Sequence, residues 1–375
     1  MNYCRLGPIE PLRNGKCFLV QSSSKNISSN HFEFVYCRRP LISLLREARM
    51  GVFGRIQLLV NHVGLLLAYV SAVFRLPQLS LLGRDFAYSC ISFELDRRGL
   101  IESIILTCND CDFQPLWIRA LHRSKVHMIW YSQSSKPISY SSDNIESVYP
   151  KYHWMRVDTH WVWTASFAEY LRILGHDKAI EVVGPIVWYL PEINAPATNK
   201  ISIVIFDTSA FNDEVALDGG AINNYNHPDN MFSFIQDIIA LKSDLEKNFQ
   251  LPVSFCLKTK RGYNAAYDKA YFDYLEKLSS LGSILLEHPS TNMYSLISRS
   301  HLVIAYPFTS PVYIAEALKV PSIYYDPTKS IVGHNFGDSL SLINFANSPD
   351  ALFNAAISAL GNTFNEEGAP EIRTV

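Results

Sequence analysis

Polar and charged side chains follow the ends of several predicted strands in the second half of the chain. In an open parallel sheet the ligand crevice lies beyond the carboxyl ends of the strands, because loops and helix N-termini converge there. A histidine, hydroxyls and cations gathered at such an edge are suited to binding phosphate groups. The residues expected to form this anion site are His288, Thr309, Ser310, Lys258, Lys260 and Arg261.

Thr309 and Ser310 stand in the segment "AYPFTSPVYIAEALK", between an apolar run and a predicted helix. Pro311 has no amide hydrogen and suits the first helical position, which makes Ser310 the natural N-cap. The free amides at that helix end favour an anion. Glu316, further along the same helix, is placed to reach a ribose. The alternative is purely local, with Ser310 capping its own helix and Glu316 an ordinary exposed carboxylate.

The other members of the set also have ordinary interpretations. His288 precedes Pro289 at a predicted helix entrance, where a histidine often serves only in the turn. Lys258, Lys260 and Arg261 are close enough along the chain to form a solvated basic loop. The proposed site therefore depends on whether the fold brings these segments to one edge.

The elements that must position these residues alternate, from residue 80 onward, between helical periodicity and short β-rich apolar runs. This alternation is typical of βα units and parallel sheets. Residues 190–200, "LPEINAPATNK", contain two prolines and no periodicity, and the alternation restarts after them. A length of 375 residues also favours two domains. We therefore predict two α/β domains, residues 1–192 and 193–375.

Composition excludes several classes of function. The formal net charge is −2 and charged residues make up 18% of the chain, so no strong positive field favours nucleic acid. Seven scattered cysteines without disulfide spacing favour a reducing compartment. Cys108 and Cys111 lack the second pair or nearby histidines of a zinc site, so no metal is expected. The N-terminus lacks the apolar core of a signal peptide, and we expect a cytoplasmic protein.

Residues 56–74 form an apolar stretch of nearly membrane-spanning length. Polar and small residues recur within and just after it at steps of three and four, which places them on one helical face. They are Gln57, Asn61, Gly64, Ala68, Ser71 and Arg75. The pattern predicts an amphipathic helix and leaves three placements open: buried in or between domains, lying on a membrane surface, or spanning a membrane.

Four segments together resemble a known family. They are "HMIWYS", "HWVWTASFAEYLRILG", "EHPS" and "AYPFTSPVYIAEALKVPSIYYDP". Between about residues 80 and 330 the chain resembles the bacterial polysaccharide-biosynthesis proteins named for a PFTS motif and, more broadly, the GT-B glycosyltransferases. This resemblance implies a GT-B-like fold, in which two Rossmann-like parallel-sheet domains face a cleft. The C-terminal domain would bind the nucleotide-sugar donor and the N-terminal domain the acceptor.

The resemblance also implies roles for individual residues. His288, Thr309 and Ser310 would contact the nucleotide phosphate, and Glu316 would correspond to the helix glutamate that many GT-B enzymes use on the nucleotide. The order His-Pro, then Ser/Thr, is also similar to the donor motifs of bacterial sialyltransferases and Kdo transferases, which use CMP-activated sugars. The chain departs from the sialyltransferases because it has no clean Asp/Glu-Gly motif for the catalytic base.

A transferase of this kind needs a carboxylate that accepts the proton of the acceptor hydroxyl. Asp110 and Asp112 follow the predicted strand "IESIILT" and are the expected catalytic residues, with Glu94 and Asp158 as weaker alternatives. Asp110 and Asp112 also spell the metal-binding Asp-x-Asp of the other major glycosyltransferase architecture. Two-domain organisation favours the metal-independent interpretation, and an ordinary turn at the strand end is the local alternative.

The sequence therefore predicts a glycosyltransferase of surface polysaccharide or lipopolysaccharide biosynthesis. The donor would be a nucleotide sugar, with CMP-activated nonulosonate or Kdo-type sugars as candidates, and no further cofactor is expected. The acceptor would be an oligosaccharide or a lipid-linked glycan, and a lipid acceptor would bring the protein to the inner face of the cytoplasmic membrane. Two alternatives stay open, because fold alone does not settle function: a nucleotide-sugar epimerase of the same fold, and a non-catalytic component of glycan assembly.

Overall fold

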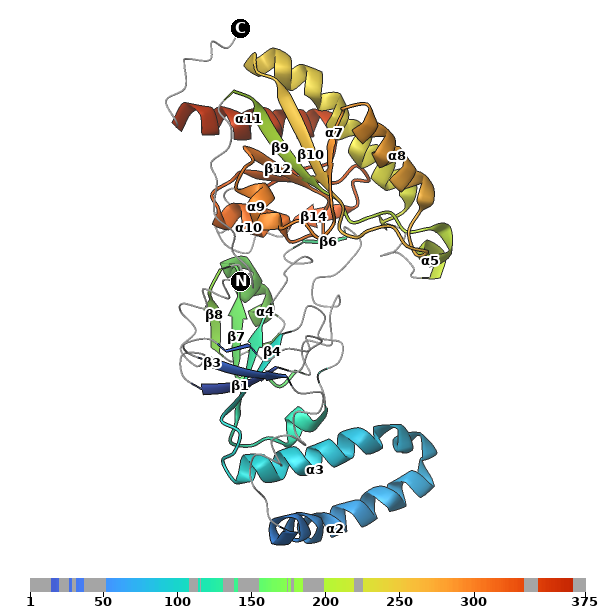
Figure 1. The fold of residues 1–375 in the computed structure, drawn as a ribbon, viewed down its shortest axis with the longest axis vertical. Helices are drawn as coiled ribbons and strands as arrows, with labels where there is room; N and C mark the ends of the chain where they lie inside the picture. The colour runs from blue at the N-terminus through green and yellow to red at the C-terminus, as the bar shows by residue number, and fades with distance from the viewer. Residues whose placement is uncertain are drawn as a thin grey trace.

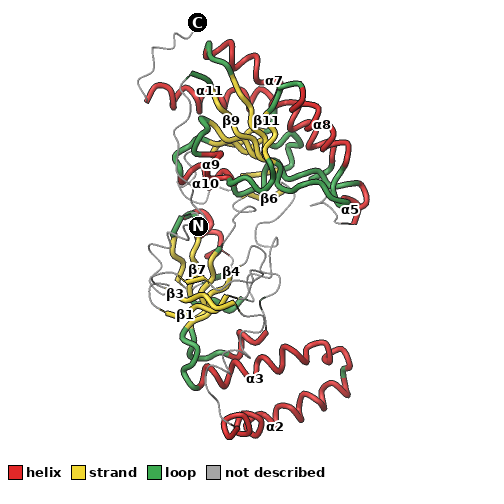
Figure 2. The backbone as a smooth tube through the Cα atoms, in the orientation of Figure 1, coloured by secondary structure: helices red, strands yellow, loops and turns green. Residues whose placement is uncertain are grey.

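The computed structural model of the chain is built around two separate parallel β-sheets, each accompanied by helices (Figures 1 and 2). This confirms the predicted α/β class. The residues that the structure describes are 15–19, 27–28, 32–36, 52–107, 114, 116–130, 138–140, 155–173, 175–176, 179–184, 199–218, 225–333 and 343–366.

The C-terminal sheet has six parallel strands, and most of them lie where apolar runs predicted strands. They are β9 (Ile201–Phe206), β10 (Val253–Lys258), β11 (Leu285–Glu287), β12 (Leu302–Ala305), β13 (Ser322–Tyr325) and β15 (Ile343–Ala346). Their spatial order is β11-β10-β9-β12-β13-β15. In chain order this is 3-2-1-4-5-6, the arrangement of a Rossmann sheet. The order reverses between β9 and β12, which places the topological switch point there.

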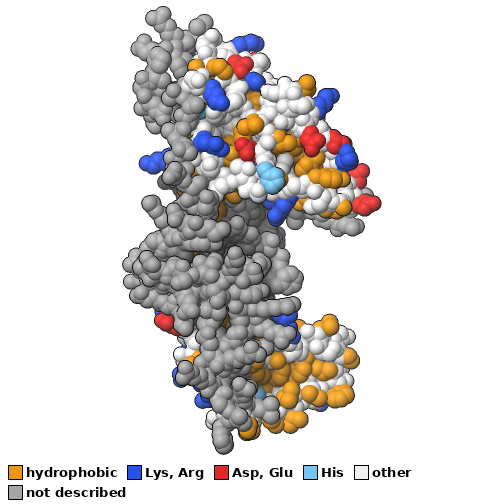
Figure 3. All heavy atoms as spheres, viewed as in Figure 1, with side chains coloured by type: hydrophobic (Ala, Val, Ile, Leu, Met, Phe, Trp, Pro, Cys, Tyr) orange, Lys and Arg blue, Asp and Glu red, His pale blue; other side chains and the backbone are white. Residues whose placement is uncertain are grey.

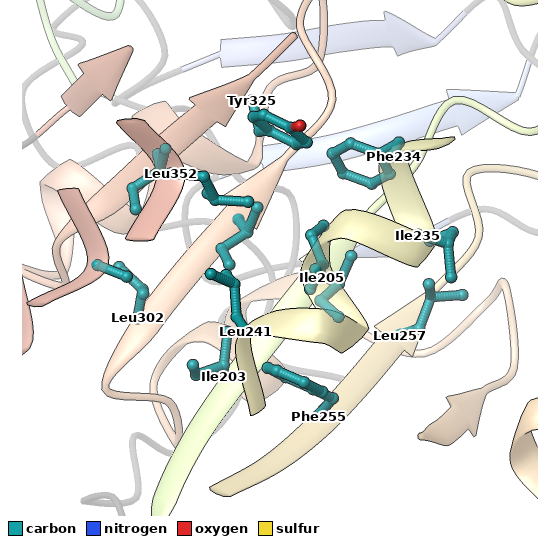
Figure 4. Close-up of a cluster of buried hydrophobic side chains, with 14 of the residues drawn as sticks. Ile203, Ile205, Phe234, Ile235, Leu241, Phe255, Leu257, Leu302, Tyr325 and Leu352 are labelled. Atoms are coloured by element: carbon teal, nitrogen blue, oxygen red, sulfur yellow. The ribbon is translucent and has the colours of Figure 1, made fainter. Parts of the chain in front are cut away.

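Helices cover both faces of this sheet. Alternate residues of each strand point to opposite sides, and since both sets are apolar, both faces have to be buried. Ile203 and Ile205 face the buried cluster formed with α7, α8 and α11 (Figure 4). Val204 and Phe206 face a second cluster, formed with α9 and α10. The helices are α7 (Pro228–Phe249), α8 (Lys269–Ser280), α9 (Met293–Ile297), α10 (Pro311–Ala317) and α11 (Pro349–Glu366), with the short α5 (Asp213–Asp218) after β9. Burial on both faces explains why these strands are continuously apolar.

The other parallel sheet has four strands that follow one another in chain order. They are β4 (Ser103–Thr107), β5 (Lys125–Ile129), β7 (Thr159–Val162) and β8 (Ala179–Val182). Helix α4 (Ala165–Ile173) packs on it through Phe167 and Leu171. Among its described strands the order does not reverse, so this sheet has no switch point comparable to that between β9 and β12.

The sequence pattern of residues 113–124, "FQPLWIRALHRS", predicts a helix, but the described part of this segment contains only a short 3₁₀ turn, η4 (Leu116–Ala120). The guanidinium of Arg156 donates to the carbonyl oxygens of Ile118, at 2.8 Å, and Leu121. Carbonyls that an α-helix would use for its own ladder are therefore bonded to a side chain from elsewhere in the fold. The prediction of a full helix was wrong for this reason.

Two further elements precede the four-stranded sheet. Strands β1 (Gly15–Leu19), β2 (Ile27–Ser28) and β3 (Phe32–Tyr36) form a small separate sheet. Helix α2 (Val52–Arg75) continues through η2 (Pro77–Leu82) into α3 (Gly83–Arg97), and α2 contacts α3. Within the described residues, no helix combines the length and the apolar character needed to cross a bilayer.

Within the described residues, two contacts that join the halves of the chain stand out. Strand β6 (Ile138–Tyr140) pairs antiparallel with β14 (Ile331–Gly333), which begins just after the turn that Asp326 holds. Trp163, directly after β7, belongs to the buried cluster on the α9 and α10 face of the C-terminal sheet. The N-terminal half therefore adds a strand and a core side chain to the second unit. The predicted linker lies largely outside the described residues.

Asp96 fixes α3 to the loop that leads into β5. Its buried carboxylate accepts hydrogen bonds from the amides of His122, Arg123 and Ser124 at 2.6, 2.9 and 2.7 Å, and from the Ser124 hydroxyl. Burial by itself would raise the pKa of Asp96. The hydrogen bonds outweigh it and lower the pKa from 3.8 to about 2. The ionised carboxylate is thus part of the folded state.

We expect Asp96→Asn to lower the free energy of unfolding at pH 7 by about 2 kcal/mol, since a pKa held below its unfolded value stabilises the fold above that value. The difference from wild type should shrink as pH falls from about 4 towards 2, where the native carboxylate takes up its proton. Urea unfolding at several pH values measures this. Asp244→Asn, in an exposed pair with Lys247, is the matched control; equal losses in both variants would contradict the role of Asp96.

Candidate functional site

The carboxyl ends of β9 and β12 lie side by side at the switch point. Phe206 is paired with Ala305, and the amide of Tyr306 donates to the carbonyl of Phe206 at 2.9 Å. The loop after β9 begins at Asp207, and the loop after β12 carries Pro307, Phe308, Thr309 and Ser310. This is the position at which doubly wound sheets bind their ligands.

Phe308 and Thr309 hold the second of these loops in shape. Thr309 is buried, its hydroxyl donates to the carbonyl of Tyr306 at 2.7 Å, and its own carbonyl accepts the hydroxyl of Tyr324. Phe308 has a left-handed backbone, with φ of 61°, and its ring packs against both core clusters and edge-on to Tyr225. The Thr309 hydroxyl is thus used inside the loop.

Ser310 occupies the N-cap position of α10, and Pro311 takes the first helical position, as predicted. The backbone of Ser310 is helical rather than extended, however, and its side chain makes no capping hydrogen bond. The local alternative, in which the Ser310 hydroxyl caps its own helix, is therefore not what the structure shows. Ser310 is also the more exposed of the two hydroxyl residues, which makes it the better candidate for contact with a ligand.

Asp207 and Ser209 tie the loop after β9 to the loop after β10. The buried Asp207 carboxylate accepts from the Tyr271 hydroxyl at 2.7 Å and from the amide of Lys260 at 2.8 Å. Burial raises the pKa of Asp207 to about 6, although these hydrogen bonds act against the rise. Ser209 adopts a φ of 62° and accepts from the amide of Arg261 at 3.1 Å. The two loops therefore form one tied edge beside the switch point.

The three predicted cations lie in different environments along this edge. Lys258 is buried, and burial lowers the pKa of its ammonium, with the Asp207 carboxylate acting in the opposite direction. Lys260 and Arg261 are exposed. Only the latter two are accessible to a ligand in solution, whereas Lys258 lies at the base of the tied loops.

His288 is exposed and lies at the outer edge of the sheet, after β11. Its Nδ1 lies 2.6 Å from the Ser290 hydroxyl and accepts from the Ser290 amide at 3.2 Å, so it helps to form a local turn. Three strand spacings, about 14 Å, separate the ends of β11 and β12. The sheet therefore does not place His288 beside Ser310, and a ligand that touches both must extend across the edge.

Glu316 is half-buried on α10, and its carboxylate makes no hydrogen bond or ion pair with any residue that the structure describes. Burial raises its pKa from 4.5 to about 7. A carboxylate in such a place, near neutrality and without a partner, is typical of functional sites.

The predicted catalytic pair, Asp110 and Asp112, lies outside the described residues, and so do Cys108 and Cys111. The two weaker alternatives have structural roles instead. Glu94 is buried and paired with Arg97 and Arg98 at 2.7 and 2.6 Å. Asp158 precedes β7 and accepts from the Val126 amide, at the end of the sheet away from the expected site. Nowhere in the described ranges do three or more His, Cys, Asp or Glu side chains form a group suited to a metal.

Trp163 is not among the predicted site residues. It follows β7, is buried, and packs in the cluster that includes Val312 and Tyr313 of α10. Its indole Nε1 is buried without a hydrogen-bond partner among the described residues. Burying an unpaired donor is costly, so such groups in native structures often have a function. The only signal in the sequence is a tryptophan at a strand end.

The sequence as a whole matches a family model described as "Polysaccharide biosynthesis PFTS motif protein", over residues 68–353. The match spans both parallel sheets and the loop at Pro307–Ser310. This chain belongs to that family. The motif for which the PFTS family is named is therefore the loop that leaves β12 at the switch point.

Comparisons with solved structures give only distant similarity. The chain is similar to the glycosylation-associated Gap123 complex from Streptococcus agalactiae (TM-score 0.42, 11% identity, covering 74% of this chain and 53% of that one). It is also similar to TarM (TM-score 0.34, 11% identity, covering 74% of this chain and 54% of that one). A third similar structure, from E. coli, is described as trehalose-6-phosphate bound with UDP-2-fluoro glucose (TM-score 0.41, 11% identity, covering 92% of this chain and 84% of that one). The chain spans about half the length of the first two. Likenesses this weak carry no argument about activity. No curated protein matches the sequence.

Removal of one hydroxyl tests whether the core holds the PFTS loop. Tyr324→Phe leaves the buried Thr309 carbonyl without its donor, so we expect the free energy of unfolding to fall by about 1–3 kcal/mol. Tyr263→Phe, at an exposed tyrosine, is the control and should change stability little. Chemical unfolding of both variants measures the difference, and no loss in Tyr324→Phe would show that the hydrogen bond does not stabilise the loop.

The raised pKa of Glu316 predicts a pH-dependent stability. Because the native carboxyl holds its proton up to about pH 7 and the unfolded one only to about 4.5, native stability should fall as pH rises between these values. Glu316→Gln should therefore be more stable than wild type at pH 8, by on the order of 1 kcal/mol, and equal to it near pH 4. Thermal unfolding at both pH values checks this. The exposed Glu276→Gln should show no such pH-dependent gain.

Proposed function

We propose that this protein is a glycosyltransferase of polysaccharide biosynthesis that transfers a sugar from a nucleotide donor to a glycan acceptor. The observation that carries the proposal is the position of the PFTS loop, at the switch point of a 3-2-1-4-5-6 sheet. A family motif at the ligand-binding point of a nucleotide-binding type of sheet supports a nucleotide site. Membership of a polysaccharide-biosynthesis family supports a sugar as the group transferred.

In this proposal the nucleotide phosphates lie over the ends of β9, β10 and β12. Ser310 donates a hydrogen bond, and the exposed Lys260 and Arg261 supply positive charge. Fixed donors and cations of this kind stabilise the charge that develops on a departing phosphate, without a metal ion. The carboxylate of Glu316, which pairs with no described residue, accepts from a ribose hydroxyl. An extended donor is long enough to reach His288 at the outer edge.

The acceptor in this proposal binds on the side of the N-terminal half. Trp163 marks the junction, since it joins the end of β7 to the α10 face of the second sheet. Asp110 or Asp112, which follow β4, would accept the proton of the acceptor hydroxyl. The donor preference that we propose is CMP, from the similarity to sialyltransferase and Kdo-transferase motifs. A lipid-linked acceptor would place the reaction at the inner face of the cytoplasmic membrane.

The proposal is tested by calorimetric titration of the full chain with CMP, UDP and GDP. We expect one of the three to bind, and Ser310→Ala to weaken its binding about tenfold, as for a lost hydrogen bond to a charged group. Ser280→Ala, at the end of α8, is the matched control, because it removes an exposed hydroxyl that lies before β11 rather than at the strand ends. No binding by any nucleotide would overturn the donor site.

Activity assays on the same protein distinguish the alternative functions. Conversion of a nucleotide sugar without any acceptor would favour an epimerase. Absence of nucleotide binding, together with full activity in the cell after Ser310→Ala and His288→Ala, would favour a non-catalytic component. Transfer that depends on an acceptor and is lost in Asp110→Asn or Asp112→Asn would support the transferase and assign its base.

A further inference from the structure

Helix α2 carries an apolar stripe along its whole length. Its members recur at steps of three and four, so they lie on one face of the helix: Ile56, Val60, Val63, Leu67, Val70 and Phe74. All six are exposed, with 63%, 64% and 85% of Val60, Leu67 and Phe74 accessible. From Ile56 to Phe74 this stripe is about 27 Å long. Single exposed apolar residues are ordinary, but a continuous row of this length marks an interaction site.

The stripe faces away from the rest of the helical hairpin. His62 and Tyr69, on another side of α2, make its contacts: the His62 Nε2 lies 3.0 Å from the Cys90 carbonyl of α3, and the Tyr69 hydroxyl donates to Leu79 at 2.7 Å. The Tyr69 ring also stacks on Phe86 of α3. With α3 held on that side, the stripe has no intramolecular partner among the described residues. Hydrophobic side chains gather over these helices in the space-filling view (Figure 3).

The surrounding charge indicates what covers the stripe. Between residues 38 and 84 the chain has one acidic residue, Glu47, and seven arginines: Arg38, Arg39, Arg46, Arg49, Arg55, Arg75 and Arg84. This segment therefore has a formal charge of +6 in a chain whose total is −2, which leaves −8 for the remainder. Of the arginines whose side chains are described, Arg75 ends α2, Arg84 starts α3, and both are exposed.

An exposed apolar helix face in a segment of the sequence this rich in arginine matches the chemistry of an anionic lipid surface. Such helices lie in the interface with the apolar face among the acyl chains, while arginines bind the phosphate headgroups. A second copy of the chain fits less well, because α2 contains two arginines and no acidic residue, so a symmetric contact through it would bring like charges together. An acidic protein partner would complement the charge of the arginines but would not account for the apolar stripe.

We propose that α2 lies on an anionic phospholipid surface with this stripe inserted, so that the protein works as a peripheral membrane protein. Only one part of this proposal rests on the proposed function: the lipid-linked acceptor, which binding to the membrane would bring within reach of the protein. Binding to lipid needs no nucleotide, so the two proposals fail separately: a protein that binds vesicles but no nucleotide keeps this one, and the reverse result keeps the other.

The test is flotation of the full chain with vesicles of phosphatidylcholine alone and of phosphatidylcholine with phosphatidylglycerol. We expect binding to the anionic vesicles, weaker binding to the neutral ones, and a decrease at high salt. Leu67→Asp and Phe74→Asp should each lower binding at least about tenfold, the loss expected when one large apolar side chain no longer inserts. Arg75→Gln should lower it about fivefold.

Leu281→Asp is the matched control, because it introduces the same charge at an equally exposed leucine, 68% accessible, far along the chain from α2. It should bind vesicles as wild type does. Circular dichroism confirms that each variant is folded. The proposal is overturned if wild type does not bind anionic vesicles, or if the stripe variants bind as well as the control. A dimer that Leu67→Asp dissociates, without vesicle binding, would assign the stripe to a second copy instead.

Discussion

The pairing of β9 with β12 is the contact on which the C-terminal unit depends. These strands are neighbours in space although β10, β11 and four described helices, α5, α7, α8 and α9, separate them in the chain, so their ends bring together two loops that are remote in sequence. Continuous apolar character on both faces of β9 and β12 makes burial between two helical layers favourable, and that burial holds the pair in the middle of the sheet. The PFTS loop occupies its position because β12 does.

Buried polar groups then give the loops their shape. Asp207 ties the loops after β9 and β10, Asp326 holds the turn that leads to β14, and the Tyr324 hydroxyl holds the carbonyl of Thr309. Each satisfies donors or acceptors that burial would otherwise leave unpaired. A site built on loops of this kind is preorganised, which is the condition for binding a charged ligand without the cost of ordering it first. Ser310 and Lys260 are among the residues of this edge that stay at least partly accessible to solvent.

Sequence patterns predicted most of this unit because the patterns are local. The runs "ISIVIF" and "VSFCLK" are strands β9 and β10 over the same residues, and Pro311 begins α10. The failures occurred where a distant side chain competed with a local preference. Arg156 takes carbonyls from the segment 116–121 and leaves a 3₁₀ turn in place of a helix. At Ser310 the cause is instead local, since its own helical backbone leaves α10 without a side-chain cap. Residues 110 and 112 remain predictions, outside the described chain.

The sequence by itself determined the class of the fold, the place of the PFTS segment at a strand end, and the amphipathic character of α2, because periodicity and turn chemistry act over a few residues. The family came from the resemblance of its motifs. Tertiary structure decided which strand ends are neighbours, since strand order follows from packing among remote segments. It separated Thr309, bonded within its loop, from Ser310, and put His288 three strands away from both. It also placed Trp163 in the core of the opposite unit, since only the folded chain brings the end of β7 against α10.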